Sequence, residues 1–180
     1  MAFLSQEKVK ELVAETASSS SGRYFNVAKI DNGSEVRLRI MDMDGVTGYE
    51  AWNVDNKPVR FEQKPVEIPE NIKTDDSGQK QIKAFLAAIV YDYSDGMFKC
   101  MSITQKSIKE SLLKFIADDD YGDPSGYDIK IGRTGEKLLT SYTLIPSPPK
   151  ALSEKLAKEW HEQKDKCNLN ALFSGEEVFS

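Results

Sequence analysis

The sequence predicts a mainly β domain with short helices, and three observations support that prediction. Residues 36–40 alternate apolar and basic side chains, the pattern of a strand with one buried face. Residues 84–93 are a nearly continuous apolar run, which indicates a central strand. From residue 83 to 147 the pattern reads strand, strand, helix, strand, strand. At 180 residues, the chain is long enough to bury the core of one such domain.

The first part of the chain predicts an arm, one or two strands and a long loop. Apolar residues at loose helical spacing run to about residue 16, and SSSSG at 18–22 is a flexible break. We expect this arm to pack on the body or to mediate self-association. Tyr49–Val54 continues the strand at 36–40 or forms a second one. Residues 57–78 include three prolines and predict a long irregular loop.

The middle of the chain predicts a hairpin, a helix and a second pair of strands. A tight turn at 94–96 leads into a strand at 97–103. Thr104 is the predicted N-cap of the next helix. Residues 127–131 and 138–145 are the predicted last strands. A helix between strands 3 and 4 of a five-stranded Greek-key barrel is the layout of an OB fold, which binds oligonucleotides or oligosaccharides.

This prediction divides the chain into three parts. Residues 1–22 are the N-terminal arm and flexible break, and residues 23–150 are the OB-fold domain. Residues 151–180 form a C-terminal helix, marked by Leu152, Leu156 and Trp160, and an acidic-aromatic tail.

Composition limits the classes of function. No apolar run is long enough to span a bilayer, and the N-terminus lacks the features of a signal peptide, so we expect a cytoplasmic protein without a membrane partner. Two cysteines and one histidine are too few for a zinc site, and we expect neither a metal nor another cofactor. No nucleophile–base pair is identifiable, and the aspartates at 118–123 are expected to form a solvated turn. We therefore predict that the chain is not an enzyme.

Basic and aromatic residues interleave in a way that suits single-stranded nucleic acid. Such a ligand needs cations for its phosphates and exposed rings on which its bases stack. The net charge of −5 argues against this class, but residues 99–114 hold four lysines and one glutamate. The candidate contacts are Arg37, Arg39, Tyr49, Trp52, Lys57, Arg60, Phe61, Lys83, Tyr91, Tyr93 and Lys99. Trp52 is the best stacking candidate.

Particular motifs resemble one protein family. The predicted helix opens with TQK and is followed by an Asp-rich turn, the segment GDPSGYDI, a charged hairpin and a proline-rich exit. With GYEAWN at 48–53 and the ending NLNALFSGEEVF, this run resembles bacteriophage single-stranded DNA-binding proteins. The resemblance implies an OB fold, sequence-tolerant binding of single-stranded DNA, and a role in phage replication or recombination in the bacterial cytoplasm. It also implies that Tyr49, Trp52, Lys57 and Arg60 contact the DNA.

The C-terminal tail predicts a second binding element. It ends in acidic and aromatic residues, as do many single-strand binders whose tails dock replication or recombination proteins. The candidate tail residues are Leu172, Phe173, Glu176, Glu177 and Phe179. A tail packed on the body is the alternative. The N-terminal arm and the barrel edge are the two candidate surfaces for a homo-oligomer. The alternative function for the whole chain is an OB-fold adaptor that binds proteins and has little affinity for nucleic acid.

Overall fold

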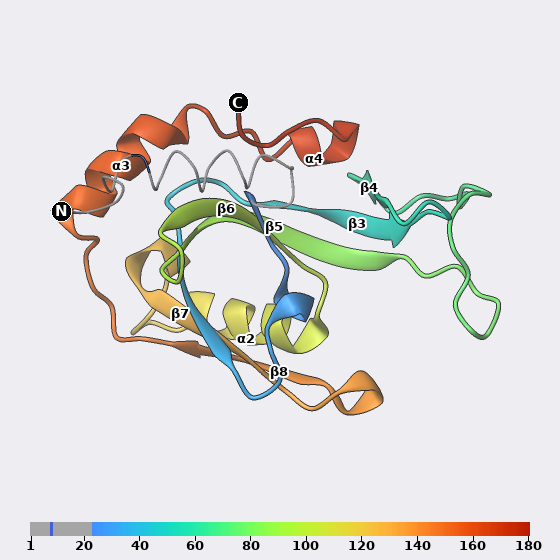
Figure 1. The fold of residues 1–180 in the computed structure, drawn as a ribbon, viewed down its shortest axis with the longest axis horizontal. Helices are drawn as coiled ribbons and strands as arrows, with labels where there is room; N and C mark the ends of the chain where they lie inside the picture. The colour runs from blue at the N-terminus through green and yellow to red at the C-terminus, as the bar shows by residue number, and fades with distance from the viewer. Residues whose placement is uncertain (1–7, 9–22) are drawn as a thin grey trace.

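The described part of the chain is mainly β, as predicted. The computed structural model describes residues 8 and 23–180, so the predicted arm lies almost entirely outside it. The strands are β1 (Tyr24–Phe25), β2 (Glu35–Ile40), β3 (Val46–Trp52), β4 (Pro58–Phe61), β5 (Lys83–Asp92), β6 (Met97–Ile103), β7 (Asp128–Thr134) and β8 (Ser141–Pro146). The helices are α2 (Lys106–Ile116), α3 (Glu154–Lys164) and α4 (Ala171–Ser174), with short 3-10 helices η2 (Val27–Lys29), η3 (Pro124–Gly126) and η4 (Lys137–Leu139) (Figure 1).

The strands form one open mixed sheet rather than a closed barrel. Their order is β1-β6-β5-β2-β7-β8, and β3 pairs with both β4 and β5. The sheet is therefore not closed into the five-stranded Greek-key barrel that the sequence predicts. One reason is that β1 pairs in parallel with β6 at Cys100 and Met101, so that this stretch of the β6 edge is already occupied. As predicted, a helix, α2, lies between the β5–β6 hairpin and β7 in chain order.

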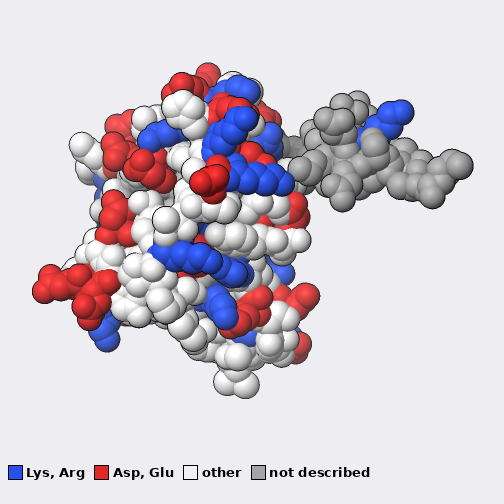
Figure 2. Space-filling view, turned by 90° about the vertical axis from the view of Figure 1, so that its left-hand side faces the viewer, with Lys and Arg blue, Asp and Glu red and all other residues white. Residues whose placement is uncertain are grey.

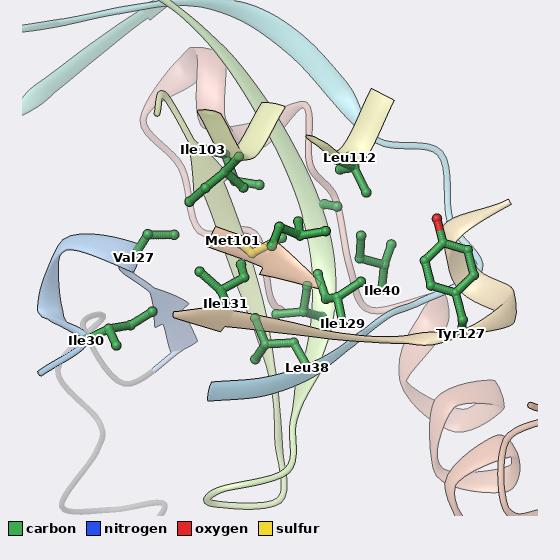
Figure 3. Close-up of a cluster of buried hydrophobic side chains, with 14 residues drawn as sticks. Val27, Ile30, Leu38, Ile40, Met101, Ile103, Leu112, Tyr127, Ile129 and Ile131 are labelled. Atoms are coloured by element: carbon green, nitrogen blue, oxygen red, sulfur yellow. The ribbon is translucent and has the colours of Figure 1, made fainter. Parts of the chain in front are cut away.

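The inner face of the sheet packs against α2. Its strands contribute Leu38, Ile40, Met101, Ile129 and Ile131, which are all buried (Figure 3). Ile108 and Leu112 of α2 join the same cluster because they are four residues apart and lie on one side of the helix. Each buried side chain of this size contributes about 1.5–3 kcal/mol to the free energy of unfolding.

The outer face of the sheet packs against the C-terminal segment, residues 151–180. Phe85, Ile89, Phe98 and Cys100 on β5 and β6 lie in a second buried cluster. Leu156 and Trp160 of α3, Leu172 of α4 and Val178 complete it. Figure 1 shows α3 and α4 lying across this side of the sheet, opposite α2. The central hairpin is thus covered on both faces.

Three local predictions were wrong. Residues 58–61 form the edge strand β4 instead of an irregular loop, with Pro58 as its first residue, where a missing N–H is tolerated. The N-cap of α2 is Gln105 and not Thr104. Leu138 and Leu139 lie in the turn η4, before β8 begins at Ser141, because Gly135 and Lys137 adopt positive φ angles of 83° and 52°.

The cysteines and the hydropathy of the helices remain to be described. Cys100 and Cys167 are both free and buried, and burial raises the pKa of Cys100 to about 12. In the region covered by the structure, no helix combines the length and hydropathy needed to cross a bilayer.

Candidate nucleic-acid interface

Four of the predicted DNA contacts lie at the two ends of the outer face. Side chains alternate along a strand, so Trp52 and Lys83 share this face with Phe85 at the start of β5. Arg37 and Tyr93 lie at the other end of β5, where Tyr93 contacts Tyr91 edge-on. β5 has 10 residues. The two ends are therefore roughly 30 Å apart, with the C-terminal segment over the stretch between them.

The first end is a cleft of about 220 Å³, here named the Trp52 cleft. It is lined by Glu50, Trp52, Lys73, Thr74, Asp75, Gln81, Lys83 and Thr104. Trp52 is the last residue of β3, and its side chain is 49% exposed. Its carbonyl oxygen accepts a hydrogen bond from the Lys73 amide at 2.8 Å, which fixes the loop beside the strand end. The cleft therefore presents an indole ring on a fixed backbone.

Two lysines and two carboxylates line the cleft, and both carboxylates are held by other groups. Glu50 pairs with Arg60 at 2.9 Å, and both side chains are largely buried. Asp75 accepts hydrogen bonds from the Ser77 hydroxyl at 2.6 Å and from Gln81 at 2.5 Å. These bonds, that from Ser77 above all, lower the pKa of Asp75 to about 2. The ring of Trp52 and the exposed Lys83 are thus the groups best placed to meet a ligand.

The second end is organised around Asp128, the first residue of β7. Its buried carboxylate accepts hydrogen bonds from Arg37 Nε at 2.9 Å, Arg39 Nη1 at 3.1 Å and the Tyr93 hydroxyl at 2.9 Å. Burial alone would raise the pKa of Asp128, but these hydrogen bonds outweigh it and hold the pKa below its usual range. Burial and the Asp128 carboxylate raise the pKa of Tyr93 to about 12.

Arg37 and Tyr93 form an exposed stack at this end. The Arg37 guanidinium carbon lies 4.6 Å from the centre of the Tyr93 ring. The Arg37 side chain is 48% exposed and Tyr93 is 37% exposed. A cation held against an aromatic ring can meet a phosphate and a base at the same place.

Three of the predicted cationic contacts instead bind carboxylates or carbonyl oxygens within the protein. Arg39 donates to Ser125 O at 2.8 Å and to Lys150 O at 2.7 Å besides Asp128, and its side chain is 3% exposed. Lys99 lies between Asp92 at 2.9 Å and Asp95 at 2.5 Å. Arg60 is held by Glu50 and lies 5.7 Å from the Phe85 ring centre. The structure therefore does not place these three as surface contacts, because buried carboxylates already neutralise them.

The remaining predicted contacts are divided between the two faces. Tyr49 and Phe61 are directly opposite each other on β3 and β4, on the face away from Trp52, and both are half-buried. Tyr91 is half-buried on the outer face, 5.2 Å from Phe98. Lys57 is exposed in the turn between β3 and β4. The eleven predicted residues do not form a single surface.

The predicted partner-binding tail is largely packed on the body. Leu172 is buried, and the Phe173 ring lies 5.9 Å from Phe85. Phe179 pairs with Cys167 as an isolated bridge, and the Arg23 guanidinium lies 4.7 Å from its ring centre. Only Glu176 and Glu177 of the five candidate tail residues are exposed. The apolar tail residues stabilise the second cluster in this conformation.

Sequence reasoning missed Lys73, which lines the Trp52 cleft. It lies in the loop read as irregular, and no periodic pattern connects it with Trp52. The isolated bridge between Asn53 and Ile72 brings it there. Only the pairing of residues distant in sequence could have identified this lysine.

The end of the molecule at which β5 finishes carries charged side chains of both signs. Figure 2 shows the end of the molecule that lies on the left in Figure 1, where basic and acidic side chains are interspersed. Over residues 8 and 23–180, no group of three or more His, Cys, Asp or Glu side chains is arranged to hold a metal ion.

Comparisons of the chain with protein-family models, curated proteins and solved structures find no match.

Proposed function

We propose that this chain is a non-enzymatic single-stranded DNA-binding protein that takes the strand at the Trp52 cleft. The observation that carries the proposal is the half-exposed indole of Trp52, fixed by the backbone and flanked by Lys73 and Lys83. A base stacked on such a ring gains about 1–3 kcal/mol, and the lysines meet the phosphates on either side of it. Because every base has an aromatic face, binding at this site would tolerate any sequence.

The strand pairing also supports an OB-type fold. β2 pairs with β5 and β7, β5 with β6, and β7 with β8, and α2 separates the two hairpins. This order of antiparallel pairs agrees with an opened OB barrel that carries the extra strands β1, β3 and β4. The resemblance in the GDPSGYDI segment points to a service role in phage replication or recombination.

Binding of a single strand is tested by titrating the intact protein into a labelled oligo-dT of about 30 nucleotides, with fluorescence anisotropy as the readout. We expect tight binding at low salt, weaker binding at moderate salt as counterions return to the phosphates, and little affinity for a duplex of equal length. A protein that ignores oligo-dT at low salt would contradict the proposal and leave the protein-binding adaptor as the better account.

A further inference from the structure

The turn between β7 and β8 carries two leucines that are exposed to solvent. Leu138 is 102% exposed and Leu139 is 83% exposed. We call residues 137–139 the leucine tip. Exposed leucines scattered singly are ordinary on a protein surface, but an adjacent pair at the end of a hairpin leaves a contiguous apolar area in water.

The leucine tip is a fixed structure and not a loose loop. Gly135 has a φ of 83°, and a Cβ at this position would overlap the carbonyl oxygen of Leu139. The Gly135 amide donates to Asn32 Oδ1 at 2.9 Å, and the Thr140 amide donates to Lys137 O at 3.2 Å. Lys137 itself adopts a φ of 52°, which is uncommon for a residue other than glycine. The backbone thus holds the leucines outward against their tendency to be buried.

The hairpin is also tied to the loop before β2. Arg133 Nη1 donates to Ala28 O at 3.0 Å and to Ile30 O at 2.9 Å. The Gly33 amide donates to Arg133 O at 2.8 Å. These bonds connect the tip to the body of the domain, so the position of the leucines is set by the sheet.

We propose that the leucine tip contacts the bases of the single strand held at the Trp52 cleft, an inference that rests on the proposed function. Two observations favour this occupant. In Figure 1 the leucine tip and the β3–β4 end of the sheet project toward the same end of the molecule. The exposed Lys137 lies directly beside the two leucines and can meet a phosphate, whereas Arg133 is hydrogen-bonded to Ala28 O and Ile30 O, and Lys130 pairs with Glu35 at 3.6 Å.

A protein occupant is less suited to this surface. A specific protein–protein interface buries on the order of 800 Å² on each partner, far more than two leucine side chains supply. In proteins that bind the minor groove of duplex DNA, leucine side chains insert between base steps, and Arg or Lys side chains contact the groove beside them. Leu138 and Leu139, with Lys137 beside them, have this combination.

A cycle of protein and DNA variants tests the inference on the full-length chain. The double variant Leu138→Ser/Leu139→Ser removes the apolar contact, and Leu113→Ser/Ile116→Ser on the exposed side of α2 is the matched control. The probes are oligo-dT of about 30 nucleotides and an abasic strand with the same number of phosphates. For the tip variant we expect about a tenfold loss of affinity for oligo-dT and no loss for the abasic strand. The control should bind both as the wild type does.

Each other result overturns the inference in a different way. Unchanged affinity for oligo-dT would mean that the leucines do not touch bases, and an equal loss on both probes would mean that they act through phosphate contacts. A wild-type dimer that becomes a monomer in the tip variant would assign the leucines to self-association. A wild type that binds neither probe would refute the proposed function itself.

A second variant guards against a loss of affinity caused by a disturbed hairpin. Leu138→Trp keeps an apolar side chain at the tip and enlarges it. We expect this variant to bind oligo-dT at least as tightly as the wild type, with an unchanged midpoint of thermal unfolding. A loss of affinity like that of the serine variant would contradict a direct contact with bases.

Discussion

Trp52 is the residue on which the proposed binding depends most. It is 49% exposed at the end of β3, while the second tryptophan, Trp160, is buried between α3 and the sheet at 5% exposure. We expect Trp52→Ala to weaken oligo-dT binding by about 1–3 kcal/mol, because one stacked base is lost. Anisotropy titrations check this, with Val54→Ala as a control at an exposed neighbouring position. Equal affinities of Trp52→Ala and wild type would remove Trp52 from the site.

The charge of Asp128 is expected to contribute to stability. This residue is buried against Arg37, Arg39 and Tyr93. Asp128→Asn leaves the buried Arg39 without its counter-ion, and we expect it to lower the free energy of unfolding by about 3–5 kcal/mol. Chemical denaturation at neutral pH measures the change. A loss below about 1 kcal/mol would show that the network contributes little.

The same carboxylate predicts how stability depends on pH. Its pKa is lowered in the folded protein, so its contribution is complete above the unfolded pKa of about 3.9. The contribution is lost as the pH falls through the folded value. We expect the stability of the wild type to fall faster than that of Asp128→Asn below about pH 4. Parallel curves for the two proteins over that range would contradict the assignment.

At the level of elements, the loop after β4 and the start of β5 supply the two lysines of the Trp52 cleft. Lys73 comes from the loop and Lys83 from the start of β5. If each neutralises one phosphate, Lys73→Ala and Lys83→Ala should each make the slope of log K against log salt less negative by about 0.7. Lys155→Ala on α3 is the control, because Lys155 is exposed on the covering helix. Identical slopes in all four proteins would exclude both lysines as phosphate contacts.

The C-terminal segment acts as a structural cover of the outer face. Trp160 lies 5.4 Å from Phe98, and Leu156 and Leu172 join the same cluster. We expect Trp160→Ala to lower the free energy of unfolding by about 3–5 kcal/mol, because it leaves a cavity between α3 and β6. Thermal or chemical unfolding measures this. An unchanged stability would show that α3 is not packed on the sheet in solution.

Elements with a strong local pattern could be predicted, and those set by distant pairing could not. The alternation at Val36–Ile40 and the apolar run of β5 identified their strands because burial repeats along the chain. The apolar pair Leu138 and Leu139 was read as the start of a strand, although backbone angles near Gly135 place it in a turn. Closure of the sheet was also mispredicted, since no local pattern indicates that β1 pairs with β6.

The same limit applies to the candidate site residues: a local sequence pattern could indicate some of them, but the partners of others become visible only in the fold. Trp52 is the best stacking candidate in the sequence because it lies beside Asn53 and near Lys57, and its side chain is 49% exposed in the structure. Arg39, Arg60 and Lys99 were read as surface cations, but each meets a carboxylate that is near in space and, for Arg39, 89 residues away in the chain. Whether an arginine or lysine points to solvent or to a buried partner depends on the sheet register, which the sequence does not state.

For the whole molecule, the net charge of −5 is compatible with a local cationic site. Folding pairs several carboxylates with arginine or lysine, as at Asp128, Glu50 and Asp92. The exposed cations near Trp52 then act over short range, because at physiological ionic strength salt screens interactions between charges that are more than about 8–10 Å apart. Affinity for a strand would therefore depend on this local site and not on the average charge.

The most direct test of the account is tryptophan fluorescence during titration with oligo-dT at low salt. Trp52 is the exposed tryptophan and Trp160 is buried, so the two can be separated by substitution. We predict strong quenching in the wild type and in Trp160→Phe, and none in Trp52→Ala. Quenching that persists in Trp52→Ala, or that is absent from the wild type at saturating DNA, would contradict a base stacked on Trp52.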